Sequence, residues 1–135
     1  MAGLLNLEGL KKAAFYHADV EIRNEAGRKL VQHYIGITHN ILKHDNERIE
    51  AGFGLVAYLE RFQKASQLRR IAEDKRPYEF GGFHEKVKIK AWQSSKAAIL
   101  CHATGEDLKT VKKKHRDFIS RTSDRPKRLY IVKTG

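Results

Sequence analysis

Apolar positions recur at helical spacing along most of the chain. Between about Leu7 and Lys43 they come three and four residues apart, the spacing that lines one face of an α-helix, as in Leu30, Tyr34, Ile37 and Ile41. Gly27 and Gly36 lie inside this stretch, and each glycine costs about 1 kcal/mol relative to alanine in a helix. The pattern therefore predicts either two helices or one helix with a bend.

A further helix is predicted from about Glu47 to Asp74. Asp45 or Asn46 is placed to cap its start, because a side-chain oxygen there accepts from the free N–H groups of the first turn. Pro77 ends it, since proline lacks an N–H donor and restricts the residue before it. The apolar row keeps the same spacing through Leu55, Leu59, Phe62, Ala65, Leu68 and Ala72.

The rest of the chain contains two more predicted helices. Residues 86–91 alternate as in a strand, but a helical spacing continues through Ile89, Trp92, Ile99 and Ala103, and we favour a helix from about Lys88 to Ala103. Thr104 is placed to accept from the N–H of Asp107 and so to cap a last helix, whose apolar side is Leu108, Val111, His115, Phe118 and Ile119. Residues 129–132 are expected to form either a short strand or an extended tail.

These elements predict a mainly α fold, an elongated bundle of about four helices in one domain of residues 1–135. A helix of about 27 residues is roughly 40 Å long, whereas a compact domain of this size has a radius of gyration of only about 14 Å. We therefore expect either an elongated helical bundle or a protomer whose helices finish burying their apolar faces against other copies. We expect residues 1–74 to supply packing and oligomer contacts and residues 75–135 to face nucleic acid.

The charge is strongly uneven. The chain has 27 Lys and Arg against 16 Asp and Glu, a net charge of +11. Residues 1–67 have a net charge of +1 and residues 68–135 a net charge of +10. Such an excess favours a polyanionic partner, because mutual repulsion destabilises the fold unless a partner neutralises it. Nucleic acid is the commonest such partner, with DNA favoured over RNA, and an anionic membrane surface is the alternative.

Basic residues on the last predicted helix form a stripe opposite its apolar row. A one-sided surface of this kind suits phosphate contacts, where released counterions supply much of the affinity; the alternative is an ordinary solvated helix face. The predicted nucleic-acid-binding residues are Arg61, Lys64, Arg69, Arg70, Lys109, Lys112, Lys113, Lys114, Arg116, Arg121, Arg125, Lys127 and Arg128.

A short segment carries a more specific pattern. Cys101, a small residue, stands four positions before Gly105, and Val111 stands six positions after it. This arrangement resembles the helix-turn-helix family, which needs these residues for its tight turn and interhelix contact. The resemblance implies that the second helix enters the major groove of DNA with Lys109, Lys112 and Lys113. Glu106 and Lys114 depart from the family, which has apolar residues at their positions.

The loop after Pro77 contains three aromatic residues, Tyr78, Phe80 and Phe83. They could stack on unpaired bases, at about 1 to 3 kcal/mol per base, or fill the end of the bundle as a plug. We favour the plug, because two consecutive glycines allow the loop to fold back.

Catalysis has little support in the sequence. The seven histidines include no HExxH pattern, and the single Cys101 cannot supply a CxxC metal site. We therefore expect no enzyme activity, no cofactor and no metal. No apolar run approaches the roughly 18 residues of a spanning helix, and the N-terminus lacks the basic region of a secretory signal. The expected location is intracellular or in a virion.

The expected function is that of a non-enzymatic structural protein that coats or packages DNA or RNA in many copies, like a nucleocapsid. In layout the chain looks like the helical coat proteins of filamentous archaeal viruses, and also like small helical subunits of RNA-guided complexes, both by fold-level analogy. A small helical subunit of a ribonucleoprotein is one alternative, and a helix-turn-helix DNA-binding regulator is another. A membrane-surface or acidic-protein adaptor is a further class, although the last helix offers no Trp for insertion.

Overall fold

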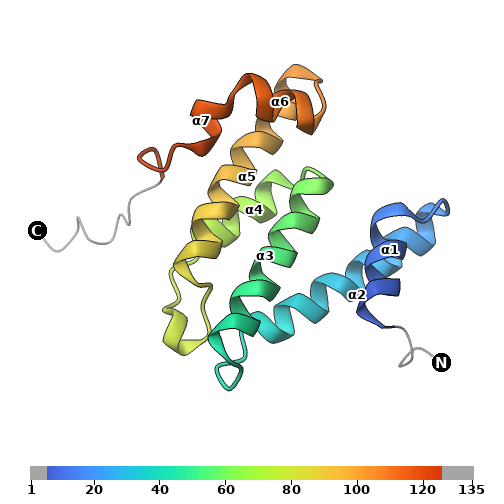
Figure 1. Cartoon of the computed structure of the whole chain (residues 1–135), viewed down its shortest axis with the longest axis vertical. Coiled ribbons are helices and arrows are strands. Elements are labelled where there is room, and N and C mark those ends of the chain that lie inside the picture. Colours follow the sequence, from blue (N-terminus) through green and yellow to red (C-terminus); the bar gives the residue numbers. More distant parts are fainter. Residues whose placement is uncertain (1–5, 126–135) are drawn as a thin grey trace, which may run out of the picture.

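The computed structural model describes residues 6–125, and these residues form seven α-helices with no strand among them. Figure 1 shows α3, α4 and α5 packed together, α2 against α3, and α1 folded back on α2. The mainly α fold is confirmed, with a central bundle of α2 to α5. The helices are α1 (Leu7–Tyr16), α2 (Val20–Thr38), α3 (Asp45–Arg61), α4 (Ala65–Ala72), α5 (Glu85–Thr104), α6 (Leu108–Lys114) and α7 (Arg116–Ser120).

The first predicted helical stretch is two helices, and it divides at residues 17–19 rather than at a glycine. Asp19 is the N-cap of α2, and its Oδ1 accepts from the backbone N–H of Glu21 at 2.9 Å. Gly27 lies within α2 and allows a close approach, because a Cβ there would lie 2.0 Å from the hydroxyl oxygen of Tyr58. This glycine therefore serves helix packing.

The single helix predicted from Glu47 to Asp74 is wrong, because the chain turns between α3 and α4. Gln63 has a φ of 55°, in the left-handed region, and its carbonyl oxygen lies 2.9 Å from Nε2 of His102 on α5. The turn brings the apolar side of α4 back onto α5.

The predicted cap of α3 at Asp45 or Asn46 is also wrong. The N-cap is His44, whose N–H donates to the Glu47 side chain at 3.4 Å.

Helix α5 is confirmed, including residues 86–91, and it ends at Gly105, which has a left-handed φ of 75°. The predicted cap at Thr104 is wrong, because Asp107 caps α6 and accepts from the N–H of Thr110 at 2.7 Å. The predicted last helix divides at His115 into α6 and α7. Residues 129–132, where a strand or tail was predicted, lie outside the described residues.

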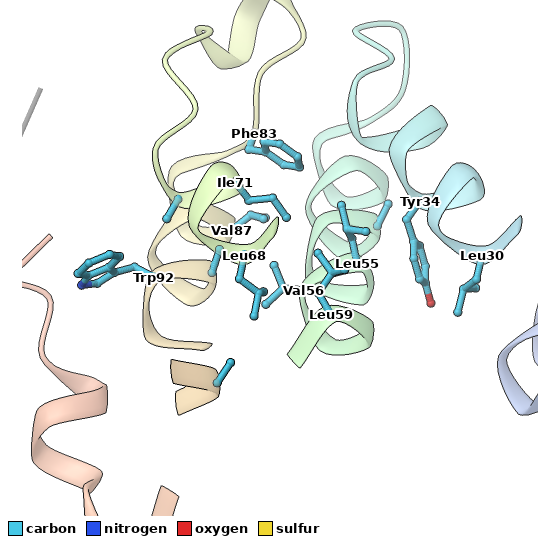
Figure 2. Close-up of a cluster of buried hydrophobic side chains, with 14 of the residues drawn as sticks. Leu30, Tyr34, Leu55, Val56, Leu59, Leu68, Ile71, Phe83, Val87 and Trp92 are labelled. Atoms are coloured by element: carbon cyan, nitrogen blue, oxygen red, sulfur yellow. The ribbon is translucent and has the colours of Figure 1, made fainter. Parts of the chain in front are cut away.

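The main core joins α2, α3, α4 and α5, as Figure 2 shows. A second, smaller cluster of Ala97, Cys101, Val111 and Ile119 packs α6 and α7 onto α5. Phe118, predicted on the buried side, is 40% exposed. Within the described residues, no helix combines the length and the apolar character needed to span a bilayer.

A buried arginine closes the end of the bundle where α2 stops. The Arg48 side chain donates to the carbonyl oxygen of Thr38 at 2.9 Å, and to those of Tyr78 and Gly82 at 2.9 and 3.2 Å. Its guanidinium also lies 3.8 Å from the centre of the Tyr78 ring. One cation thus fixes the end of α2 and the loop between α4 and α5 in place.

The aromatic loop acts largely as the predicted plug. Phe83 is 8% exposed and belongs to the main core (Figure 2), whereas Phe80 is 74% exposed. The Tyr78 hydroxyl donates to Asp45 at 2.7 Å. Gly82 is required where the loop folds back, because a Cβ there would lie 1.9 Å from the Arg76 carbonyl oxygen. Of the three aromatic side chains, Phe80 alone is left free to stack on a base.

Candidate nucleic-acid interface

Three cations on α6 and α7 are exposed and form no ion pair within 4 Å in the described part of the chain, although Lys109, after the hydrogen bonds from Thr110, helps to lower the pKa of the nearby Asp107 carboxyl. Lys109, Lys113 and Arg116 form no ion pair with any residue in the described part of the chain. The first two lie on α6, four residues apart and so on one side of the helix, and Arg116 begins α7. These side chains can therefore meet phosphate groups without first breaking an internal salt bridge.

Other predicted site residues already form ion pairs with carboxylates of the same chain. Nζ of Lys112 lies 2.5 Å from Oε1 of Glu60 on α3. Lys114 pairs with Glu106, and Arg125 pairs with Glu85. These cations offer less charge to a partner than the sequence predicts, because a carboxylate already neutralises each of them. Lys127 and Arg128 lie outside the described residues.

An open hollow of about 490 Å³ lies beside the exposed cations. Its lining is mostly basic, with one carboxylate from Asp117 and the half-exposed ring of Phe118. The guanidinium of Arg121 lies 5.8 Å from the centre of that ring. The hollow is wide and polar, which suits a solvated phosphate group better than an apolar ligand. The basic residues that line it are Lys113, Lys114, His115, Arg116 and Arg121.

A buried lysine holds this surface in position. Lys96 on α5 is 4% exposed, and its Nζ donates to the carbonyl oxygens of Phe118 at 2.6 Å and of Arg121 at 2.9 Å. The same ammonium pairs with the Asp124 carboxylate at 2.9 Å. Trp92 Nε1 donates to the other carboxylate oxygen at 3.0 Å. The end of α7 and the segment that follows it are thereby fastened to α5.

The contacts of Lys96 and Trp92 with Asp124, which we call the clasp, also set the charge of Asp124. The hydrogen bonds from Trp92 and then from Lys96 hold the pKa of the Asp124 carboxyl below its ordinary value. Asp124 therefore remains ionised and continues to balance Lys96 across the neutral pH range. The sequence analysis did not identify Lys96 or Asp124. A lysine four positions after Trp92, within a predicted apolar face, was the signal that could have indicated a buried, paired lysine.

The four predicted site residues around α4 have different surroundings. Arg61 lies 5.7 Å from the centre of the Tyr16 ring and so faces α1. Arg69 pairs with Glu73 at 2.8 Å and lies 5.6 Å from the Trp92 ring centre, on the side of α5 that holds Asp124. The remaining two, Lys64 and Arg70, are exposed. Of these four residues, only Arg69 lies near Trp92, which is part of the clasp between α5 and the segment after α7.

The segment that resembles a helix-turn-helix has the expected local packing. Cys101 and Val111 are buried in one cluster across the turn at Gly105. Burial, together with the nearby carboxylates, raises the pKa of the Cys101 thiol. Glu106 and Lys114, which depart from the family pattern, form an ion pair with each other. A salt bridge thus occupies the place of the family's apolar contact, and α6 has only seven residues.

Comparisons of the chain with protein-family models, with curated proteins and with solved structures each found no match. Within the described residues, no three His, Cys, Asp or Glu side chains gather in a way that could hold a metal ion.

Proposed function

We propose that this chain is a non-enzymatic protein that binds nucleic acid through its phosphates and coats it in many copies, with α6 and α7 as the main contact surface. The observation that carries the proposal is the set of exposed cations Lys109, Lys113 and Arg116, the last two of which line an open basic hollow. Charges of one sign that outnumber the nearby carboxylates cost stability, and a polyanion removes that cost. DNA is favoured over RNA, as in the sequence-based expectation.

Binding through this surface is expected to be independent of base sequence. Phosphate contacts fix a protein on the nucleic acid but carry no base information. The side chains around the hollow are mostly Lys and Arg, which are the usual phosphate ligands. Affinity should therefore be similar for different sequences of one length and should fall steeply with salt.

The test compares two variants of equal net charge. The triple substitution of Lys109, Lys113 and Arg116 by Gln removes the proposed phosphate ligands. The matched control replaces three exposed lysines elsewhere, Lys12, Lys86 and Lys90, by Gln. Binding of both to single- and double-stranded DNA and RNA is measured over a series of salt concentrations.

For the first variant, the slope of log K against log salt should become shallower by about 3, because each lost phosphate contact removes slightly less than one released counterion. The control should retain most of the parent slope. Equal losses in the two variants would assign the binding to net charge alone, and a parent protein whose affinity ignores salt would refute phosphate binding. Light scattering on long DNA then separates a coat, which forms filaments of many copies, from a ribonucleoprotein subunit that binds as one or two copies.

A second candidate, a helix-turn-helix regulator, is favoured by one observation, the burial of Cys101 and Val111 in one cluster across the Gly105 turn. It predicts that α6 enters the major groove and that one duplex sequence is bound far more tightly than others. Selection of DNA sites from a random pool tests it. Enrichment of a defined motif would support the regulator, and a pool that stays random would support the sequence-independent coat.

A further inference from the structure

A groove between α1 and α2 lies outside the basic surface. Its volume is about 630 Å³, and small residues at three positions of its wall, Gly9, Ala13 and Ala26, leave this space open. Leu10 and Ile22 make the wall apolar. The groove between α1 and α2 is therefore a largely apolar recess, which stays open because small side chains line part of it.

Large apolar side chains of α1 and α2 remain exposed, and one of them, Ile22, lines the recess. Ile22 is 47% exposed, Val20 is 54% exposed and Leu7 is 36% exposed. Exposed apolar side chains next to an apolar recess are typical of an interface between proteins.

The charges on the groove indicate what covers it. Glu21 and Lys29 both line it, and neither forms an ion pair within the described residues. They lie eight residues apart on α2, which is about 12 Å along a helix. In an antiparallel pair of α2 helices related by a two-fold axis near Glu25, Glu21 of each copy faces Lys29 of the other. Glu25 and Arg28 also line the groove, and they already pair with each other within one copy. The charges left for a second copy are therefore Glu21 and Lys29, and a two-fold interface satisfies both.

We propose that this groove is the interface of a homodimer. Ile22 of each copy packs into the recess of the other, and the two reciprocal pairs of Glu21 with Lys29 fix the antiparallel register. Residues 7–38 contain five basic and four acidic side chains, so two copies meet here without the repulsion that their cationic halves would produce. Figure 1 shows α6 and α7 packed at the far end of α5, away from α1. The dimer therefore leaves the basic surfaces of both copies accessible.

The inference does not depend on nucleic-acid binding, so its test uses the full chain alone. Sedimentation velocity over a range of concentrations should show a dimer for the parent protein. Ile22→Asp should give a monomer, because it places a charge in the recess. The control Leu42→Asp changes a side chain that is 90% exposed in the turn after α2, and it should remain a dimer. A parent protein that stays monomeric at every concentration, or an Ile22→Asp variant that still dimerises, would overturn the proposal.

Charge reversal tests the register. Glu21→Lys and Lys29→Glu should each weaken self-association at least tenfold, because each homodimer then contains two pairs of like charges. An equimolar mixture of these two variants should form a heterodimer, since every pair is again opposite in sign. Recovery of the dimer in the mixture also shows that both variants are folded. A mixture as weak as its components would exclude the reciprocal pairing of residues 21 and 29.

Discussion

The ammonium group of Lys112 lies 2.5 Å from the carboxylate of Glu60 and so joins α6 to the end of α3. The other oxygen of the same carboxylate accepts from the Ser94 hydroxyl at 2.6 Å. Lys113, the next residue, is exposed and has no such partner among the described residues. Two adjacent lysines therefore differ: the first supports the packing of α6, and the second is exposed to solvent.

Replacing these two lysines one at a time should separate the effect on folding stability from the effect on nucleic-acid binding. Lys112→Gln should lower the free energy of unfolding by about 1 kcal/mol, because Glu60 loses a half-exposed partner, and should change the salt dependence of nucleic-acid binding little. Lys113→Gln should leave stability unchanged and make the salt slope shallower by about 1. Urea unfolding and binding titrations at several salt concentrations measure both effects. The assignment is wrong if Lys112→Gln weakens binding as much as Lys113→Gln.

Lys96→Met should be strongly destabilising. It leaves the Asp124 carboxylate and two backbone carbonyls without their shared donor, and breaking a buried ion pair costs about 3 to 5 kcal/mol. Because Asp124 is partly exposed, we expect a loss of about 2 to 3 kcal/mol in the free energy of unfolding. Lys90→Met, at an exposed position of the same helix, is the control and should change it by less than about 0.5 kcal/mol. Similar values for the two variants would show that the clasp contributes nothing.

Acid should release the clasp in a way that Trp92 reports. The pKa of Asp124 is lowered from its ordinary 3.8 in the folded protein, so its stabilising effect is complete above pH 3.8 and is lost as the pH falls through the lowered value. Trp92 is the only tryptophan, and its fluorescence should change in this acidic range. Asp124→Asn should remove that change, whereas Asp107→Asn, which alters the cap of α6, should retain it. An unaltered titration in Asp124→Asn would disprove the link.

Two helical glycines should respond in opposite directions to alanine. A Cβ at Gly52 would lie 2.7 Å from a methyl carbon of Val87, where α3 meets α5, whereas a Cβ at Gly36 meets no heavy atom within 4 Å. We expect Gly52→Ala to lower the free energy of unfolding by about 1 to 3 kcal/mol through overpacking. Gly36→Ala should raise it by up to about 1 kcal/mol, because alanine is the better helix former. Thermal and urea unfolding compare the two, and the same sign for both would contradict the close contact.

The helical period was sufficient to predict the fold class and much of the core. Leu55, Leu59 and Leu68 belong to the predicted apolar row and are buried. The turn between α3 and α4 was missed because Gln63, a residue with no strong turn preference, takes a left-handed conformation. His102, thirty-nine residues away, contacts its carbonyl oxygen. A contact between distant residues thus accompanies this turn, and the local pattern does not contain it.

The candidate surface was predictable only in part for a similar reason. Charge spacing identified Lys109, Lys113 and Arg116, and the structure leaves them exposed. It could not show that Glu60, fifty-two residues before Lys112, pairs with that lysine. It also gave no link between Lys96 and Asp124, since both types of residue are usually found in solvent.

The cations inside the fold bind mainly to backbone oxygens. Arg48 donates to three carbonyls, Lys96 to two, and Lys88 to that of Asp74 at 2.9 Å. Buried contacts of this kind are screened far less by dissolved ions than exposed charges are. If the proposed function holds, raising the ionic strength should therefore release the bound nucleic acid while the protein stays folded. The strength of binding can then be followed to very high salt on a molecule that has not begun to melt.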